Sequence, residues 1–260
     1  MKTMFMRKNV TLRILLIIVI LFISIIYTSV TNNISIMEVF SAKKELPIYS
    51  VDTEEKKISI SFDAAWGDEY TKDILDILDK YNVKSTFFLV GFWVDKYPEH
   101  VKEIYDRGHD VGNHSSNHPY MSKLSEEQMT QELNKTGDKI KSITGEKPIL
   151  FRPPFGDYND MVISVCRDNG YYAIQWDVDS LDWKELGVQP VVDRVTRNVK
   201  NGSIVLFHNN AKYISQYLPI VIERLQEQGY EIVPISELIY KDNFYMDSTG
   251  KQIKENRTGD

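Results

Sequence analysis

Short apolar runs alternate with amphipathic helical segments about seven times in this chain, and that alternation constrains the fold more than any other feature. The apolar residues Ile74, Leu75, Ile77 and Leu78 recur at helical spacing within 71–81, for example. The expected strands are Lys57–Phe62, Ser85–Val90, Asp110–Asn113, Ile149–Arg152, Tyr172–Trp176, Ile204–His208 and Tyr230–Pro234. Repeats of this kind predict an α/β fold built on a parallel sheet or barrel. The length favours an incomplete (β/α) barrel over the eight-fold version.

The ends of the expected helices carry recognisable signals. Ser125 and Gln128 form a possible capping box for a helix that runs to Ser142. Glycines follow the segments that end at 107, 169 and 228, as is typical of helix termination. Pro190 stands near the first turn of a further helix.

The N-terminal region is predicted to lie outside this domain. Four basic residues within 1–13 accompany an apolar run, and residues 12–30 are about long enough to span a bilayer. We expect a basic cytoplasmic segment at 1–11, a single-pass signal anchor at 12–30, a linker at 31–56, the folded domain at 57–240 and a polar, mobile tail at 241–260. The charge asymmetry places the domain outside the cytoplasm. Cleavage near Ser41–Ala42 is the alternative, and it would release the same domain as a secreted protein.

Charge argues against a nucleic-acid partner. Residues 1–30 hold four of the 31 Lys and Arg side chains and none of the 37 Asp and Glu side chains. The rest of the chain is therefore strongly acidic and does not attract a phosphate backbone. A neutral or amine-bearing polymer is an easier partner.

Two histidines four residues apart, His114 and His118, are candidates for a metal site. Imidazole is the commonest side-chain metal ligand near neutral pH, and this spacing on a helical turn would place both rings on one side. The pattern alone leaves two unrelated surface histidines as an equal alternative.

Other polar residues fall at the ends of expected strands, where α/β folds gather their chemistry. Asp63, Arg152 and His208 each end an apolar run, and the acidic segment 177–183 follows another. Taken singly, Asp63 fits a helix N-cap or turn residue better than a catalytic one, and His208 fits a hydrogen-bonded core histidine better. Arg152 fits a structural ion pair and a functional role equally. Together with the histidine pair they are the parts of a metal-assisted hydrolase.

These segments, in the same order, resemble the motifs of the polysaccharide deacetylases of the NodB-homology class, carbohydrate esterase family four. The segments are 61–67 (SFDAAWG), 114–118 (HSSNH), 152–156 (RPPFG), 179–183 (DSLDW) and 206–208 (LFH). The resemblance covers roughly residues 57–240. Within the family, the variant around Trp66, the membrane anchor and the size look most like the PdaB-type sporulation deacetylases.

The resemblance implies a distorted (β/α)7 barrel that removes acetyl groups from N-acetylated cell-wall polysaccharide by hydrolysing an amide bond. It implies that Asp63 is the general base, that Arg152 orients it, and that Asp182 tunes His208. His208 is then the general acid that protonates the leaving amine.

The resemblance also implies that His114 and His118 bind a divalent metal ion, with zinc expected. It places Trp183, Leu206, Phe155 and Pro153 around the substrate pocket, with the backbone near Phe155 binding the oxyanion.

One position departs from the family pattern. The second aspartate of the first motif, normally a third metal ligand, is Ala64 here. Catalytic zinc sites usually have three protein ligands, so weaker metal binding is expected. A glycan-binding or assembly protein with weakened or no catalysis on the same fold is therefore the alternative function.

Overall fold

The computed structural model describes residues 17–28 and 44–255, and the chain divides into two compact units, Met1–Lys44 and Glu45–Asp260. In the first unit, residues 17–28 form a helix. Among the residues that the structure describes, no helix has the length and apolar character needed to cross a membrane. The segment 1–11, both ends of the expected anchor (12–16, 29 and 30) and positions 31–43 of the expected linker lie outside the described residues.

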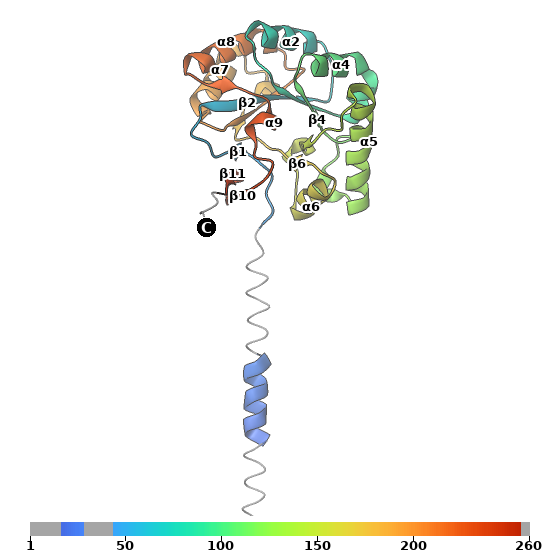
Figure 1. The fold of residues 1–260 in the computed structure, drawn as a ribbon, viewed down its shortest axis with the longest axis vertical. Coiled ribbons are helices and arrows are strands. Elements are labelled where there is room, and N and C mark those ends of the chain that lie inside the picture. Colours follow the sequence, from blue (N-terminus) through green and yellow to red (C-terminus); the bar gives the residue numbers. More distant parts are fainter. Residues whose placement is uncertain (1–16, 29–43, 256–260) are drawn as a thin grey trace, which may run out of the picture. The chain divides into compact units, whose positions relative to one another are not determined.

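The second unit is built on one parallel sheet (Figure 1). Its strands are β2 (Lys57–Ala64), β3 (Thr86–Leu89), β4 (Asp110–Asn113), β5 (Leu150–Phe151), β6 (Tyr172–Ala173), β7 (Val178–Asp179), β8 (Ile204–His208) and β9 (Glu231–Ile232). Their order is β6-β5-β4-β3-β2-β8-β7, and β9 pairs with the start of β2. Within 44–255 no pairing joins β6 to β7, so the sheet curls without closing. The expected α/β fold with an incomplete parallel barrel is confirmed.

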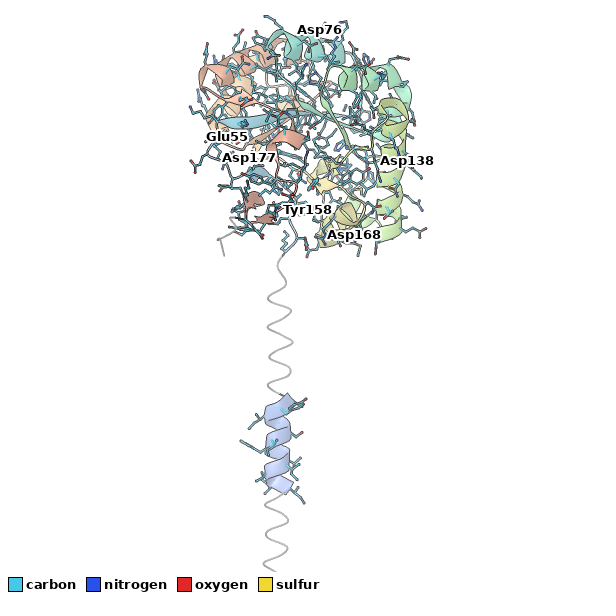
Figure 2. The ribbon with its side chains drawn as sticks, viewed as in Figure 1. Glu55, Asp76, Asp138, Tyr158, Asp168 and Asp177 are labelled. Carbon is cyan, nitrogen blue, oxygen red and sulfur yellow. The ribbon has the colours of Figure 1, made fainter. Side chains whose placement is uncertain are left out.

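Helices cover the convex side of the sheet, and Figure 1 shows α2, α4, α5, α7 and α8 along its outer rim. The helices are α2 (Thr71–Lys80), α3 (Gly91–Lys96), α4 (Pro98–Asp106), α5 (Glu126–Thr144), α6 (Asp160–Asp168), α7 (Val188–Asn198), α8 (Ile214–Glu227) and α9 (Ile235–Leu238), with short 3-10 turns η1 (Met121–Lys123), η2 (Pro154–Gly156) and η3 (Asp182–Lys184). Acidic side chains such as Asp76 on α2 and Asp138 on α5 lie at the outer surface of this layer (Figure 2). The negative charge of the domain is therefore carried in part by the outer helices.

Strand β2 shows how the sequence directs side chains to the two faces of the sheet. Ile58, Ile60 and Phe62 are fully buried in the main hydrophobic cluster between the sheet and the helices. The alternate residues are polar, and successive side chains of a strand point to opposite faces. Ser61 and Asp63 therefore face the inside of the curled sheet, where the Ser61 hydroxyl accepts a hydrogen bond from Arg152.

The expected elements agree with the structure where the pattern is long. Strands β4 and β8 have the expected bounds, and Ser125 and Gln128 form the expected capping box of α5. Strand β7 and the short helices α3 and α9 were not expected. Each of these is only two to six residues long, which is too short to show a period.

Both boundaries of the domain differ from the expectation. The expected linker contributes β1 (Ser50–Val51), and the expected tail contributes β10 (Phe244–Met246) and β11 (Lys251–Lys254), which form a second, three-stranded sheet. The polar composition of 241–255 was misleading because Gln252 is fully buried. Its side-chain amide accepts a hydrogen bond from the backbone N–H of Tyr240 and donates one to the Tyr240 carbonyl. The prediction of a mobile tail is therefore wrong for 244–254.

Candidate active site

Asp63 and His208 lie side by side at the carboxyl ends of two neighbouring strands. They are register partners in the parallel pair β2–β8. Both line one cavity of about 560 Å³. The strand ends of the curled sheet thus bring together a carboxylate and an imidazole that are 145 positions apart in the sequence.

Arg152 holds the Asp63 carboxylate. Its guanidinium is fully buried, donates from Nη1 to Asp63 Oδ1 at 2.7 Å and lies 4.1 Å from the ring centroid of Phe88. From Nη2 it also donates to Ser61 Oγ and to the backbone oxygen of Gln175. Burial alone would raise the pKa of Asp63, but the charge of Arg152 outweighs it and lowers the pKa. Asp63 is therefore ionised and fixed in orientation, as a general base requires.

The buried Asp182 carboxylate contacts His208 and fixes its orientation. Its Oδ1 lies 2.7 Å from Nδ1 of His208, and its Oδ2 accepts the backbone N–H of His208 and the hydroxyl of Tyr217. Burial lowers the pKa of His208, yet the hydrogen bond and charge of Asp182 outweigh this effect and raise the pKa. With Nδ1 turned toward Asp182, Nε2 of His208 is left to exchange a proton with a substrate.

The histidine pair lies in a loop after β4, not on the helical turn that the spacing suggested. Ser115 and His118 have positive φ (67° and 57°), which ends any helical continuation. The two rings nevertheless meet, with centroids 5.0 Å apart. His114 Nε2 is 3.6 Å from Asp63 Oδ2, so the pair shares the cavity with the carboxylate.

A buried acid that the motif spacing did not reveal shapes this loop. Glu132 on α5 accepts the backbone N–H groups of Ser116 and Asn117 on Oε2 and the side-chain amide of Asn117 on Oε1. The side-chain oxygen of Asn113 accepts a further hydrogen bond from the backbone N–H of Ser115. These contacts take the place of helical hydrogen bonds. In the sequence, Glu132 stands out only as an acidic residue on the helix face that also carries Met129, Leu133 and Ile140.

The donor set fits a metal ion in part. His114 Nδ1 lies 2.6 Å from the backbone oxygen of Arg152, which is an acceptor, so this nitrogen carries the proton and the Nε2 lone pair faces the cavity. Burial lowers the pKa of His118 to about 4, so that ring is neutral at physiological pH. Within 44–255, however, no group of three His, Cys, Asp or Glu side chains is arranged to hold a metal ion. Two imidazoles fit a divalent ion, but the protein ligand set is incomplete.

Aromatic and apolar side chains line the cavity. Of the four expected pocket residues, Phe155, Trp183 and Leu206 are among them. Pro153 is buried and is not among the lining residues, because it is the rigid start of the η2 turn that presents Phe155. The lining residues that the motifs did not mark as pocket are Ala65, Trp66, Trp176, Asp179 and Asn210.

Backbone strain concentrates in the loops around the cavity. The non-glycine residues with positive φ beyond β4, β5 and β7 are Ser115, His118, Phe155, Leu181 and Glu185. Such conformations cost on the order of 1–3 kcal/mol each and persist where the surrounding structure enforces them, commonly at functional sites. Phe155 is informative because its ring remains 56% exposed, so burial does not compensate for its φ of 60°.

Comparison with known proteins places this arrangement in a family. The polysaccharide deacetylase profile matches residues 50–174. A peptidoglycan-N-acetylglucosamine deacetylase of Bacillus cereus is 37% identical over 196 residues, which cover 74% of this chain and 92% of the relative. This chain belongs to the polysaccharide deacetylase family.

Other members of the family differ in architecture and in activity. The peptidoglycan-N-acetylmuramic acid deacetylase PdaC of Bacillus subtilis is 36% identical over 201 residues, which cover 77% of this chain but only 42% of PdaC. A family 4 carbohydrate esterase from Bacillus anthracis that is described as a pseudoenzyme superposes with a TM-score of 0.72 at 38% identity, covering 74% of this chain and 68% of that one. A mutant of that pseudoenzyme has restored enzymatic activity.

The departure of this deacetylase at Ala64 is visible in the structure. Ala64 is buried in the main hydrophobic cluster, whereas Asp63 before it and Ala65 after it line the cavity. Ala65 belongs to the same cluster, so position 64 is a buried, apolar position next to the cavity. An alanine there supplies no donor atom to the histidine pair.

Proposed function

We propose that this chain hydrolyses the N-acetyl amide of amino sugars in a cell-wall glycan and releases acetate. The observation that carries the proposal is the pairing of Asp63 and His208 as register neighbours, each held by its own buried partner. Arg152 keeps one group ionised, and Asp182 raises the pKa of the other. Acid–base hydrolysis of an amide requires a deprotonated base and a protonated acid that face the same cavity.

The reaction follows from these positions. Asp63 takes a proton from the water that attacks the acetyl carbonyl. His208, in its protonated form, donates a proton from Nε2 to the sugar nitrogen, because an amine is a poor leaving group unless it is protonated. Trp183 and Leu206 form apolar walls suited to the acetyl methyl group.

His114 and His118 would hold the divalent metal ion, which we expect to be zinc. Such an ion supplies polarisation of the acetyl carbonyl and a lower pKa of water. The neutral rings and the outward lone pair of His114 support this assignment.

The anchor and the location are part of the proposal. The apolar run within 12–30 and its basic flank support a single-pass membrane anchor with the domain outside the cytoplasm, and a secreted form after cleavage is the alternative. The substrate is then peptidoglycan or a spore-wall glycan, and the likeness to PdaB-type proteins favours a role in sporulation.

A second function has its own support. The two-histidine donor set and the likeness to a pseudoenzyme favour a glycan-binding or assembly protein without catalysis.

Acetate release by the purified full-length chain separates the two functions. With the hexamer of β-1,4-linked N-acetylglucosamine and with peptidoglycan as substrates, the wild type should release acetate, and Asp63→Asn should lower the rate by about 10²–10⁴-fold. Asn keeps the shape of the side chain but not the charge that pairs with the buried Arg152, so a thermal melt of the variant must show that it still folds. Unchanged glycan binding with no acetate from either protein would support the binding function instead.

A further inference from the structure

Four exposed aromatic side chains are linked through ring contacts that include His118 in the cavity. Trp66 and Phe155 each contact the His118 ring, with centroids at 5.0 and 4.5 Å. Phe92 lies 6.4 Å from Trp66, and Tyr120 stacks on Phe155 at 4.4 Å with an interplanar angle of 19°. We call Phe92, Trp66, Phe155 and Tyr120 the aromatic strip.

The aromatic strip is unusual for a protein surface. Its rings are between 37% and 59% exposed. Single exposed apolar residues are ordinary, but a contiguous exposed group marks a site of binding. The inner members, Trp66 and Phe155, line the cavity, whereas Phe92 and Tyr120 are not among its lining residues. The strip therefore continues beyond the cavity itself.

The backbone beneath the strip is held in place. The carbonyl of Gly67, next to Trp66, accepts hydrogen bonds from Trp93 Nε1 at 2.7 Å and from Asn209 Nδ2 at 2.9 Å. On the other side of His118, Asp157 accepts both the N–H and the hydroxyl of Ser122, which ties the turn after Tyr120 to the turn after Phe155. The rings are thus presented by rigid loops, so little entropy is lost when they bind.

We propose that the aromatic strip binds the sugar rings that neighbour the reacting unit and makes this chain selective for polymeric glycan over short fragments. The apolar C–H face of a pyranose ring stacks on the electron-rich face of an aromatic ring. Phe92 and Tyr120, at the outer ends of the strip, contribute only when the glycan is long enough to reach them. This inference rests on the proposed function for the identity of the ligand.

The test compares a long and a short substrate in the same proteins. For Tyr120→Ala in the full-length chain, kcat/KM for the N-acetylglucosamine hexamer should fall about 3- to 10-fold more than kcat/KM for the dimer. Tyr120→Phe should retain the wild-type ratio, because its ring still stacks. Tyr245→Ala, which removes a 45% exposed ring on β10 outside the cavity lining, should also retain it. A loss that only reflects folding lowers both rates equally and leaves the ratio unchanged.

The dissociation constants of hexamer and dimer, measured by calorimetry on the same variants, keep the test independent of catalysis. If the wild type releases no acetate but Tyr120→Ala weakens hexamer binding selectively, the proposed function fails and the strip stands. If Tyr120→Ala leaves the hexamer-to-dimer ratio of both kcat/KM and affinity at the wild-type value, the inference is wrong.

Discussion

His208 and the pair His114 and His118 face the same cavity and both are held by buried partners, but the two groups differ at one position. Behind His208, the buried Asp182 makes three hydrogen bonds, and every one of its partners lies in the same domain. Behind the pair, the scaffold is equally well built, since Glu132 and the Arg152 carbonyl orient the loop and one ring. What differs is a single ligand position, where Ala64 lies in the main hydrophobic cluster.

The departure from the family pattern is therefore local. Leaving a buried charge without its partner is costly, so the paired charges of the site also stabilise the fold. Here Asp63, Arg152 and Asp182 remain buried and bonded. We call His114 and His118 the metal side of the cavity, and His208 with Asp182 the acid side. The metal side should limit activity through its affinity for the metal ion, and the acid side through the rate of proton transfer.

The largest effect should come from the acid side. Asp182→Asn removes the charge that raises the pKa of His208, so the histidine loses its proton at lower pH. We expect kcat to fall about 10²-fold or more. The alkaline limb of the pH–rate profile should move to lower pH, because a raised pKa is what keeps the imidazolium present as pH rises. Rates measured across pH on the hexamer check this.

Tyr217→Phe is the matched control for Asp182→Asn. It removes one hydrogen bond to Asp182 and leaves the charge in place. Its alkaline limb should stay close to that of the wild type. An unshifted profile for Asp182→Asn would mean that His208 is not the titrating acid, and the contrast between the two sides of the cavity would then disappear.

A smaller effect is expected on the metal side. Ala64→Asp should tighten zinc binding about tenfold or more, because it adds the carboxylate that the family pattern places there. Without zinc, the variant should be less stable than the wild type, since position 64 is buried among apolar side chains. Zinc should restore its melting temperature.

Ala64→Asn has nearly the same size as Ala64→Asp but no charge, so its burial costs less. Zinc titration by calorimetry, with thermal melts of both variants, separates ligation from packing. Equal zinc affinity in the wild type and Ala64→Asp, with no recovery of melting temperature, would show that position 64 does not reach the metal.

The sequence could predict the parts of the fold and site that carry a local pattern. Strand β8 shows a run of apolar residues that ends at His208, so both its bounds and its terminal histidine were predictable. Glu132, Tyr217 and Gln252 were not, because each acts through a contact with a distant segment and has no pattern of its own. The helical turn expected for the histidine pair was wrong for the same reason, since Glu132 on α5 sets that loop.

The most direct test of the account is acetate release from the N-acetylglucosamine hexamer by the full-length wild type, first with a chelator and then with added zinc. We predict that the chelator lowers the rate to that of Asp63→Asn and that zinc restores it, because two histidines suffice to hold the metal ion when zinc is supplied. A rate that the chelator leaves unchanged while Asp63→Asn abolishes it would contradict the account.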